Sequence, residues 1–154
     1  MQQYQRPALV IAVCLGTFMA SLDISIGNVA LNTLQSSLNT TMAGLQWVVD
    51  AYALCLSALI LSSGPLGDRY GRKRIWMAGI ALFTFGSAVC ALSGSLPVLL
   101  TGRVIQGIAG AAVIPGALTL LAHAFPEQKA RLRVIGIWSS VSAVSLALGP
   151  LLGG

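Results

Sequence analysis

The sequence predicts an all-α membrane protein, and two observations support that prediction. The chain has 154 residues, of which 56% are hydrophobic and only 8% are charged, whereas a soluble domain carries about 25% charged residues. Five long segments free of Asp, Glu, Lys and Arg follow one another along the chain. They are apolar on every face, whereas the strands of a membrane β-barrel alternate apolar and polar residues. We therefore expect a bundle of five membrane-spanning helices.

The predicted helices are long enough to cross a membrane, which requires about 20 residues. The second helix is expected to begin near Trp47, because Trp is typical of the membrane interface. The connection between the third and fourth helices is short, so these two are expected to be antiparallel neighbours. The last segment has no polar stop, and the chain is therefore expected to be truncated. The predicted helices of this single transmembrane domain cover about 8–31, 45–66, 75–92, 97–124 and 134–154.

The basic residues predict the orientation. Arg6 precedes the first helix, the second and fourth connections are basic, and the other two connections carry no charge. By the positive-inside rule, the N-terminus is then cytoplasmic, in the plasma (inner) membrane, and five crossings leave the C-terminus outside. A nucleic-acid-binding protein would need its basic residues on one soluble face. We therefore expect membrane lipid and no nucleic acid as a partner.

Three ionisable residues lie inside the predicted spans, where a charge costs at least about 2.5–3.5 kcal/mol. They are Asp23 in the first helix, Asp50 in the second and Arg103 in the fourth. At 1.5 Å per residue, each lies about 8 to 12 Å below the outer end of its helix. We interpret them as part of a proton or cation pathway, with a purely structural buried ion pair as the alternative. Gln106, one turn after Arg103, and Asn28 are predicted to extend the same polar lining.

Other reactive residues give no catalytic or metal-binding pattern. His123 and Glu127 are four residues apart, which makes only a weak case for a metal site. The cysteines Cys14, Cys55 and Cys90 are scattered through apolar segments without metal or redox spacing. We therefore expect no cofactor, no metal and no enzymatic activity.

The connection between the second and third helices has a distinctive pattern. It reads Gly64-Pro65-Leu66-Gly67-Asp68-Arg69-Tyr70-Gly71-Arg72-Lys73-Arg74. Glycines permit a tight turn, and Asp68 can pair with Arg69 or Arg72. The pattern closely resembles the G-x-L-a-D-R-x-G-R-[RK] signature of the major facilitator superfamily, which lies between helices 2 and 3 of that family.

Further segments agree with this resemblance. Residues 103–111 are similar to the family's helix 4 motif, R-x-x-Q-G-x-g-a, and residues 149–154 to the G-P-x-x-G-G motif typical of helix 5 in antiporters. Residues 22–31 are similar to the L-D-x-T-I-V-N-V-A-L-P stretch of the 14-helix drug:proton antiporters of the EmrB/QacA type, with Ser25 for Thr and Gly27 for Val. The segment from Trp47 to Tyr52 resembles their W-V-V-x-x-Y, and Asp50 within it resembles QacA-like exporters of organic cations.

The resemblance implies the N-terminal portion of a proton-coupled exporter of drugs or lipophilic organic cations that works by alternating access. It implies proton or cation binding at Asp23 and Asp50, with Arg103 acting on them. It also implies a gating turn, formed by Gly64, Gly67, Asp68, Arg69, Gly71, Arg72 and Lys73. The helix 5 motif is formed by Gly149, Pro150, Gly153 and Gly154. The implied partners are a cationic, amphipathic small molecule, protons and the remaining helices of the transporter. The alternative is a short membrane protein that assembles with or regulates other subunits and transports nothing itself.

Overall fold

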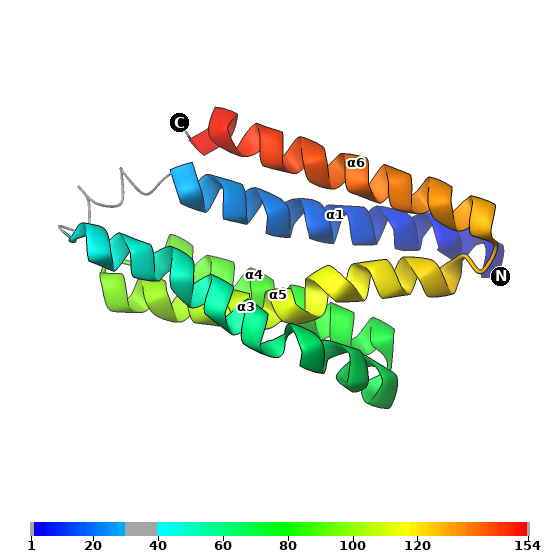
Figure 1. Ribbon diagram of the computed structural model, residues 1–154, viewed down its shortest axis with the longest axis horizontal. Helices are drawn as coiled ribbons and strands as arrows, with labels where there is room; N and C mark the ends of the chain where they lie inside the picture. The colour runs from blue at the N-terminus through cyan, green and yellow to red at the C-terminus, as the bar shows by residue number, and fades with distance from the viewer. Residues whose placement is uncertain (1, 30–39, 154) are drawn as a thin grey trace.

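The computed structural model describes residues 2–29 and 40–153, which are almost entirely helical (Figure 1). The helices are α1 (Gln2–Val29), α3 (Met42–Tyr70), α4 (Arg72–Ala91), α5 (Leu96–Ala124) and α6 (Gln128–Gly153). All five are long and apolar enough to cross a membrane. The predicted fold class is confirmed, and the chain is an integral membrane protein.

Local signals set the ends of these helices. α3 begins after Thr41, whose hydroxyl oxygen accepts a hydrogen bond from the Gly44 N–H at 3.2 Å. Gly71 alone separates α3 from α4, and its φ of +96° is a conformation that other residues rarely adopt. α5 begins after Ser95, which is extended, and Pro97 in its first turn sacrifices no helical hydrogen bond. The connections from α3 to α4 and from α4 to α5 are therefore short enough to reverse the chain within a few residues.

The helices extend further than the apolar segments alone predict. α1 begins at Gln2 rather than near 8, α3 continues to Tyr70, and α6 begins at Gln128 rather than near 134. The added residues are mostly polar or basic. A helix satisfies its own backbone hydrogen bonds whatever its side chains are, so apolar content marks the membrane span and not the helix end. Residues 30 and 31 of the first predicted helix lie outside the described residues.

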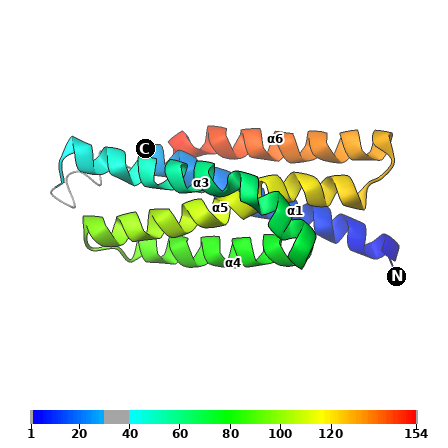
Figure 2. The same cartoon turned by 60° about the horizontal axis from the view of Figure 1, so that its bottom comes forward.

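Helix α5 lies at the centre of the bundle. Helices α3 and α4 both pack along α5, while α1 packs chiefly against α6 and also contacts α5. Figure 1 shows α1 and α6 side by side, and Figure 2 shows α4 lying along α5. The expected antiparallel pairing of the third and fourth predicted helices, α4 and α5, is confirmed.

Two apolar clusters hold the helices together. The first joins α1, α4, α5 and α6 through Val13, Trp76, Ala117, Leu120, Leu121 and Val134. The second joins α1, α3, α4 and α5 through Ala20, Tyr52, Phe83, Ala109 and Val113. Large apolar side chains such as Leu61 and Leu92 are instead 86% exposed. Such an apolar outer surface suits a protein surrounded by lipid.

Candidate functional site

Three polar side chains meet inside the bundle between α1 and α5. The Asp23 carboxylate accepts a hydrogen bond at each oxygen: Arg103 Nη1 donates to Oδ2 at 2.8 Å, and Gln106 Nε2 donates to Oδ1 at 2.9 Å. Arg103 Nη1 also donates to Gln106 Oε1 at 3.3 Å. Arg103 and Gln106 are one turn apart, so the same face of α5 presents both donors. The structure thus brings together three of the predicted pathway residues.

This group is buried within the bundle. Arg103 is 9% exposed, Gln106 is fully buried, and the Asp23 side chain is 18% exposed. Charges at such depth are found paired, because an isolated charge inside a membrane span is costly. The Arg103 Nε atom is also buried, and it has no hydrogen-bond partner in the part of the chain that the structure describes. The Asp23–Arg103 pair is electrically neutral only while Asp23 is ionised.

Two glycines make room for the group. A Cβ atom on Gly27 would collide with the Arg103 guanidinium, and one on Gly102 would collide with the Cys90 thiol. The Cys90 thiol donates to Gln106 Oε1 at 3.5 Å. The Gln106 oxygen therefore faces Arg103 and Cys90, which leaves the amide nitrogen to face the carboxylate.

Asp50 does not join this group. The buried face of α3 contains Leu45, Val48 and Tyr52, and a helix of 3.6 residues per turn places Asp50 on the opposite side. Its side chain is half-buried, and within residues 2–29 and 40–153 it has no hydrogen bond or ion pair. Depth along the helix places Asp50 near the other charges, but its direction around the helix separates it from them. Asn28 lies in α1, and its side chain falls outside the part that the structure describes.

A small cavity adjoins the ion pair on the side of α3. Its volume is about 30 Å³, and it is lined by Ile24, Gly27, Val48, Val49, Tyr52 and Arg103. This is enough for one or two water molecules. Water in this cavity would border the guanidinium that holds Asp23.

The predicted gating turn is helical on both sides of Gly71. The Gly71 N–H donates to the Gly67 carbonyl at 2.9 Å, which closes the last turn of α3. Gly67 is buried beside the side chain of Arg72, whereas Gly64 is exposed. Lys73 is exposed in the first turn of α4. The chain therefore reverses at one residue, not over an extended loop.

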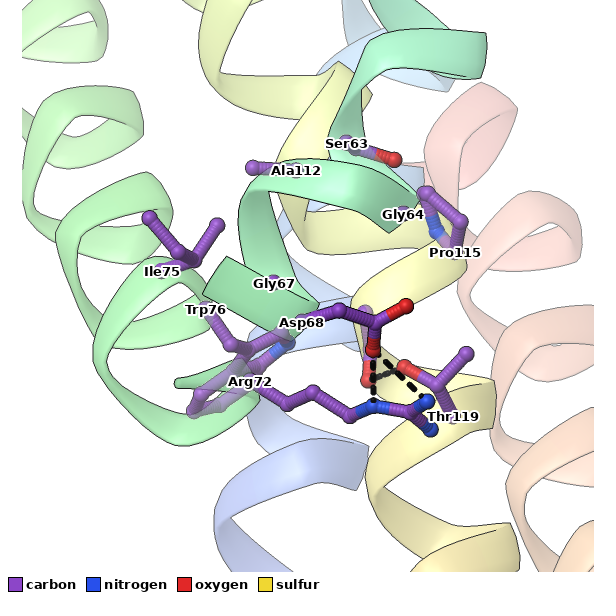
Figure 3. Close-up of a pocket in the computed structure, with 11 residues that line it drawn as sticks. Ser63, Gly64, Gly67, Asp68, Arg72, Ile75, Trp76, Ala112, Pro115 and Thr119 are labelled. Carbon is purple, nitrogen blue, oxygen red and sulfur yellow. Dashed lines mark hydrogen bonds and ion pairs between the residues drawn. The ribbon is translucent and has the colours of Figure 1, made fainter. Parts of the chain in front are cut away.

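An ion pair links the two helices of this turn. Arg72 Nε and Nη2 both donate to Asp68 Oδ1, at 3.0 and 2.8 Å (Figure 3). Of the two basic partners considered from the sequence, the structure selects Arg72. The Arg69 guanidinium lies 5.4 Å from the centroid of the Tyr70 ring instead. The Asp68 and Arg72 side chains border a cavity of about 70 Å³ between α3, α4 and α5.

The helix 5 motif lies in the second half of α6, where this helix faces α1. Ser145 and Gly149 are both buried, and a Cβ on Gly149 would collide with Ser25. The Ser25 hydroxyl donates to the Leu146 carbonyl at 3.0 Å. Small residues thus permit close contact between the two helices. Of the other motif residues, Pro150 and Gly153 continue α6, and Gly154 lies outside the described residues.

His123 and Glu127 do not share a helix face. α5 ends at Ala124, so Glu127 lies in the connection to α6. Both side chains are exposed. Within the described ranges, no group of three or more His, Cys, Asp or Glu side chains is arranged to hold a metal ion.

Sequence reasoning missed three residues that border the ion-pair group. Gly27 stands where the related motif has Val. This smaller residue was the one sign in the sequence that space is left beside the first helix for the Arg103 side chain. Tyr52 belongs to a motif, but the motif does not reveal which helix its hydroxyl faces. Cys90 gave no signal, because its contact with Gln106 depends on how α4 packs against α5.

Comparisons with known proteins identify the family of this chain and several of its relatives. The family profile described as Major Facilitator Superfamily matches residues 13–154. The methylenomycin A resistance protein of Bacillus subtilis (strain 168) is 40% identical over 147 residues, which cover 96% of this chain and 32% of that protein. The multidrug resistance protein Stp of Mycobacterium tuberculosis (strain CDC 1551 / Oshkosh) is 46% identical, and the drug efflux pump JefA of the same strain is 43% identical. Each of these two alignments covers 94% of this chain, and 27% and 28% of the respective relative. The chain thus spans about a third or less of the length of these relatives.

Proposed function

The chain belongs to the major facilitator superfamily, and we propose that it forms the N-terminal part of a proton-coupled exporter. The proposed substrates are drugs or amphipathic organic cations, moved by alternating access without chemical conversion. The printed names of relatives, a multidrug resistance protein and a drug efflux pump, support this substrate class. The proposed location is the plasma (inner) membrane with the N-terminus in the cytoplasm. The remaining helices of the transporter are then partners of this bundle.

The observation that carries the proposal is the contact of Asp23 with Arg103 and Gln106. Guanidinium groups are not deprotonated in proteins, so in this proposal Asp23 is the member of the pair that takes up and releases the proton. A proton on Asp23 cancels the attraction and leaves a buried guanidinium without its counter-ion. That loss favours a rearrangement of α1 against α5, which is the kind of two-state element that proton coupling requires.

Other residues take supporting roles in this mechanism. Asp50 lies away from the Asp23 pair, and its half-buried carboxylate is available to a cationic substrate or a second proton. The Asp68–Arg72 pair and Gly71 form the gating turn, because they fix the angle between α3 and α4 at the proposed cytoplasmic end. The close contact of Gly149 with Ser25 joins α6 to the helix that carries Asp23.

The test of this proposal is a transport measurement. A complete transporter that carries this sequence is reconstituted into liposomes with a fluorescent organic cation and a trapped pH indicator. We expect an imposed pH gradient to drive cation movement, and a cation gradient to move protons in the opposite direction. Cation movement that leaves the internal pH unchanged and ignores the imposed gradient would refute proton coupling.

A further inference from the structure

The Tyr52 hydroxyl has no partner in the described arrangement of the helices. Tyr52 is 8% exposed, and its hydroxyl is buried without a hydrogen-bond partner among residues 2–29 and 40–153. Buried tyrosine hydroxyls usually have a partner, because an unpaired polar group inside a protein is costly. A buried hydroxyl without a partner therefore points to a partner that arrives in another state of the protein.

Two glycines of α5 fix the position of Tyr52. A Cβ on Gly107 would come within 2.6 Å of the Tyr52 carbonyl oxygen, and one on Gly110 within 2.9 Å of its hydroxyl oxygen. The ring therefore lies along α5 from Gly107 towards Gly110. It belongs to the same apolar cluster as Ala20 of α1. Tyr52 thus extends from α3 along α5, within a cluster that also includes the helix that carries Asp23.

The Tyr52 hydroxyl lies beside Gly110, which is about one helical turn along α5 from Gln106 of the ion-pair group. On α1, Asp23 follows Ala20 by three residues, and on α5, Gln106 precedes Gly110 by four. One turn corresponds to about 5 Å. Tyr52 and Arg103 also line the same small cavity of about 30 Å³. The Tyr52 hydroxyl therefore lies near the residues that hold the Asp23 carboxylate, on the side towards the Gly71 end of the bundle.

We propose that the Tyr52 hydroxyl is the hydrogen-bond partner of protonated Asp23. The inference rests on the proposed function, because it requires Asp23 to bind a proton from the aqueous phase. The new carboxylic O–H is a donor, and it then faces the donor groups of Arg103 and Gln106, which previously donated to the carboxylate. The Tyr52 oxygen, by contrast, has free lone pairs that can accept this hydrogen bond.

The neighbouring helices offer few competing titratable groups. Arg103 on α5 only donates, and Cys90 on α4 already donates to Gln106. The charged residues of α6 all lie within its first six residues, and Asp50 lies on the opposite side of α3. On protonation, Asp23 therefore exchanges its ion pair with Arg103 on α5 for a hydrogen bond to Tyr52 on α3.

Infrared difference spectroscopy of the chain in lipid bilayers tests this inference. A protonated carboxyl group absorbs at a C=O stretching frequency that rises when its hydrogen bond is lost. At low pH we expect a band from protonated Asp23, which Asp23→Asn removes. In Tyr52→Phe the same band should move to higher wavenumber. Thr84→Val is the matched control, because the Thr84 hydroxyl donates at 2.9 Å to the Ile80 carbonyl of its own helix, and it should leave the band in place.

The outcomes separate this inference from the proposed function. An Asp23 band at the same wavenumber in wild type and Tyr52→Phe would overturn the inference and leave proton binding at Asp23 intact. No Asp23 band at any pH would overturn both. Tyr52→Phe removes only an unpartnered hydroxyl, so we expect it to unfold at the wild-type temperature or above. If it fails to fold, isotope-labelled tyrosine provides a second readout. A tyrosine C–O mode should shift with pH in wild type but not in Asp23→Asn, and a mode that ignores pH in wild type would overturn the inference.

Discussion

At the residue scale, the proposed proton coupling depends on one carboxylate, that of Asp23. Its two oxygens hold the donors of Arg103 and Gln106. Removing one partner of a buried ion pair leaves the other charge uncompensated, with a penalty of roughly 3–5 kcal/mol. Protonation of the carboxylate also removes its negative charge, and it leaves every heavy atom of the side chain in place. The sequence shows which ionisable residues lie within the predicted spans and about how deep they are. It does not show which of them pair, because pairing depends on the direction in which each helix face points.

Gly27→Ala tests whether the space beside Arg103 sets the ion-pair geometry. The added Cβ would collide with the guanidinium tip, which is flexible and can move aside without backbone motion. We expect the unfolding free energy to change by no more than about 1 kcal/mol, the usual scale of Gly-to-Ala changes in helices. The distance between the Asp23 carboxyl carbon and the Arg103 guanidinium nitrogens should increase, as measured by solid-state NMR dipolar couplings. Unchanged couplings would contradict the assigned role, and Gly94→Ala, whose Cβ meets nothing within 4 Å, is the control.

At the element scale, the sequence predicts where the helices lie more reliably than it predicts which face of each helix packs against its neighbours. Apolar length identified the spans, because a membrane helix must hide its backbone for about 20 residues whatever it packs against. The ends could not be predicted as well, since α3 and α6 continue through polar residues. Asp50 illustrates why the packed face of a helix is hard to predict. Its depth could be estimated from the sequence, but α3 packs on α5 through the face that contains Val48 and Tyr52, and Asp50 lies on the other side.

The contact between α1 and α6 predicts a contrast between two glycines of one helix. In Gly149→Ala, the Cβ would collide with the Ser25 side chain and crowd its backbone, so we expect a loss of about 1–3 kcal/mol from overpacking. In Gly136→Ala, the Cβ meets nothing within 4 Å, and a stability equal to wild type or up to about 1 kcal/mol higher is expected. Unfolding followed by far-UV circular dichroism in lipid measures both. Equal stabilities would contradict the close contact.

At the turn between α3 and α4, we expect a substitution that impairs transport and leaves the stability of the protein nearly unchanged. The Asp68 and Arg72 side chains are 63% and 41% exposed, and exposed ion pairs contribute only about 0.2–1 kcal/mol. Asp68→Asn should therefore lower the unfolding free energy by less than about 1 kcal/mol while reducing transport by the complete protein. Chemical unfolding and efflux are measured on the same preparations. A loss of transport explained fully by unfolded protein would argue against a gating role.

At the scale of the whole molecule, the charge distribution predicts the orientation. Single cysteines at Thr41, Gly94 and Gln128 all replace exposed residues, in a background from which Cys14, Cys55 and Cys90 have been removed. A membrane-impermeant thiol reagent should label positions 41 and 94 in intact cells, because the positive-inside rule places them outside. Position 128 should react only after the membrane is opened. Labelling of position 128 in intact cells would reverse the proposed topology.

Asp23→Asn in the complete transporter tests whether Asp23 couples protons to transport. Asn keeps the shape and one acceptor oxygen, so it removes the titrating group with little change in packing. The measurement is efflux driven by a pH gradient, divided by the amount of correctly inserted complete transporter. We predict that Asp23→Asn loses uphill efflux per inserted molecule while downhill movement of the substrate persists. If Asp23 and Arg103 form only a structural pair, the amount of inserted protein will decrease and efflux per inserted molecule will stay at the wild-type value, which would contradict proton coupling through Asp23.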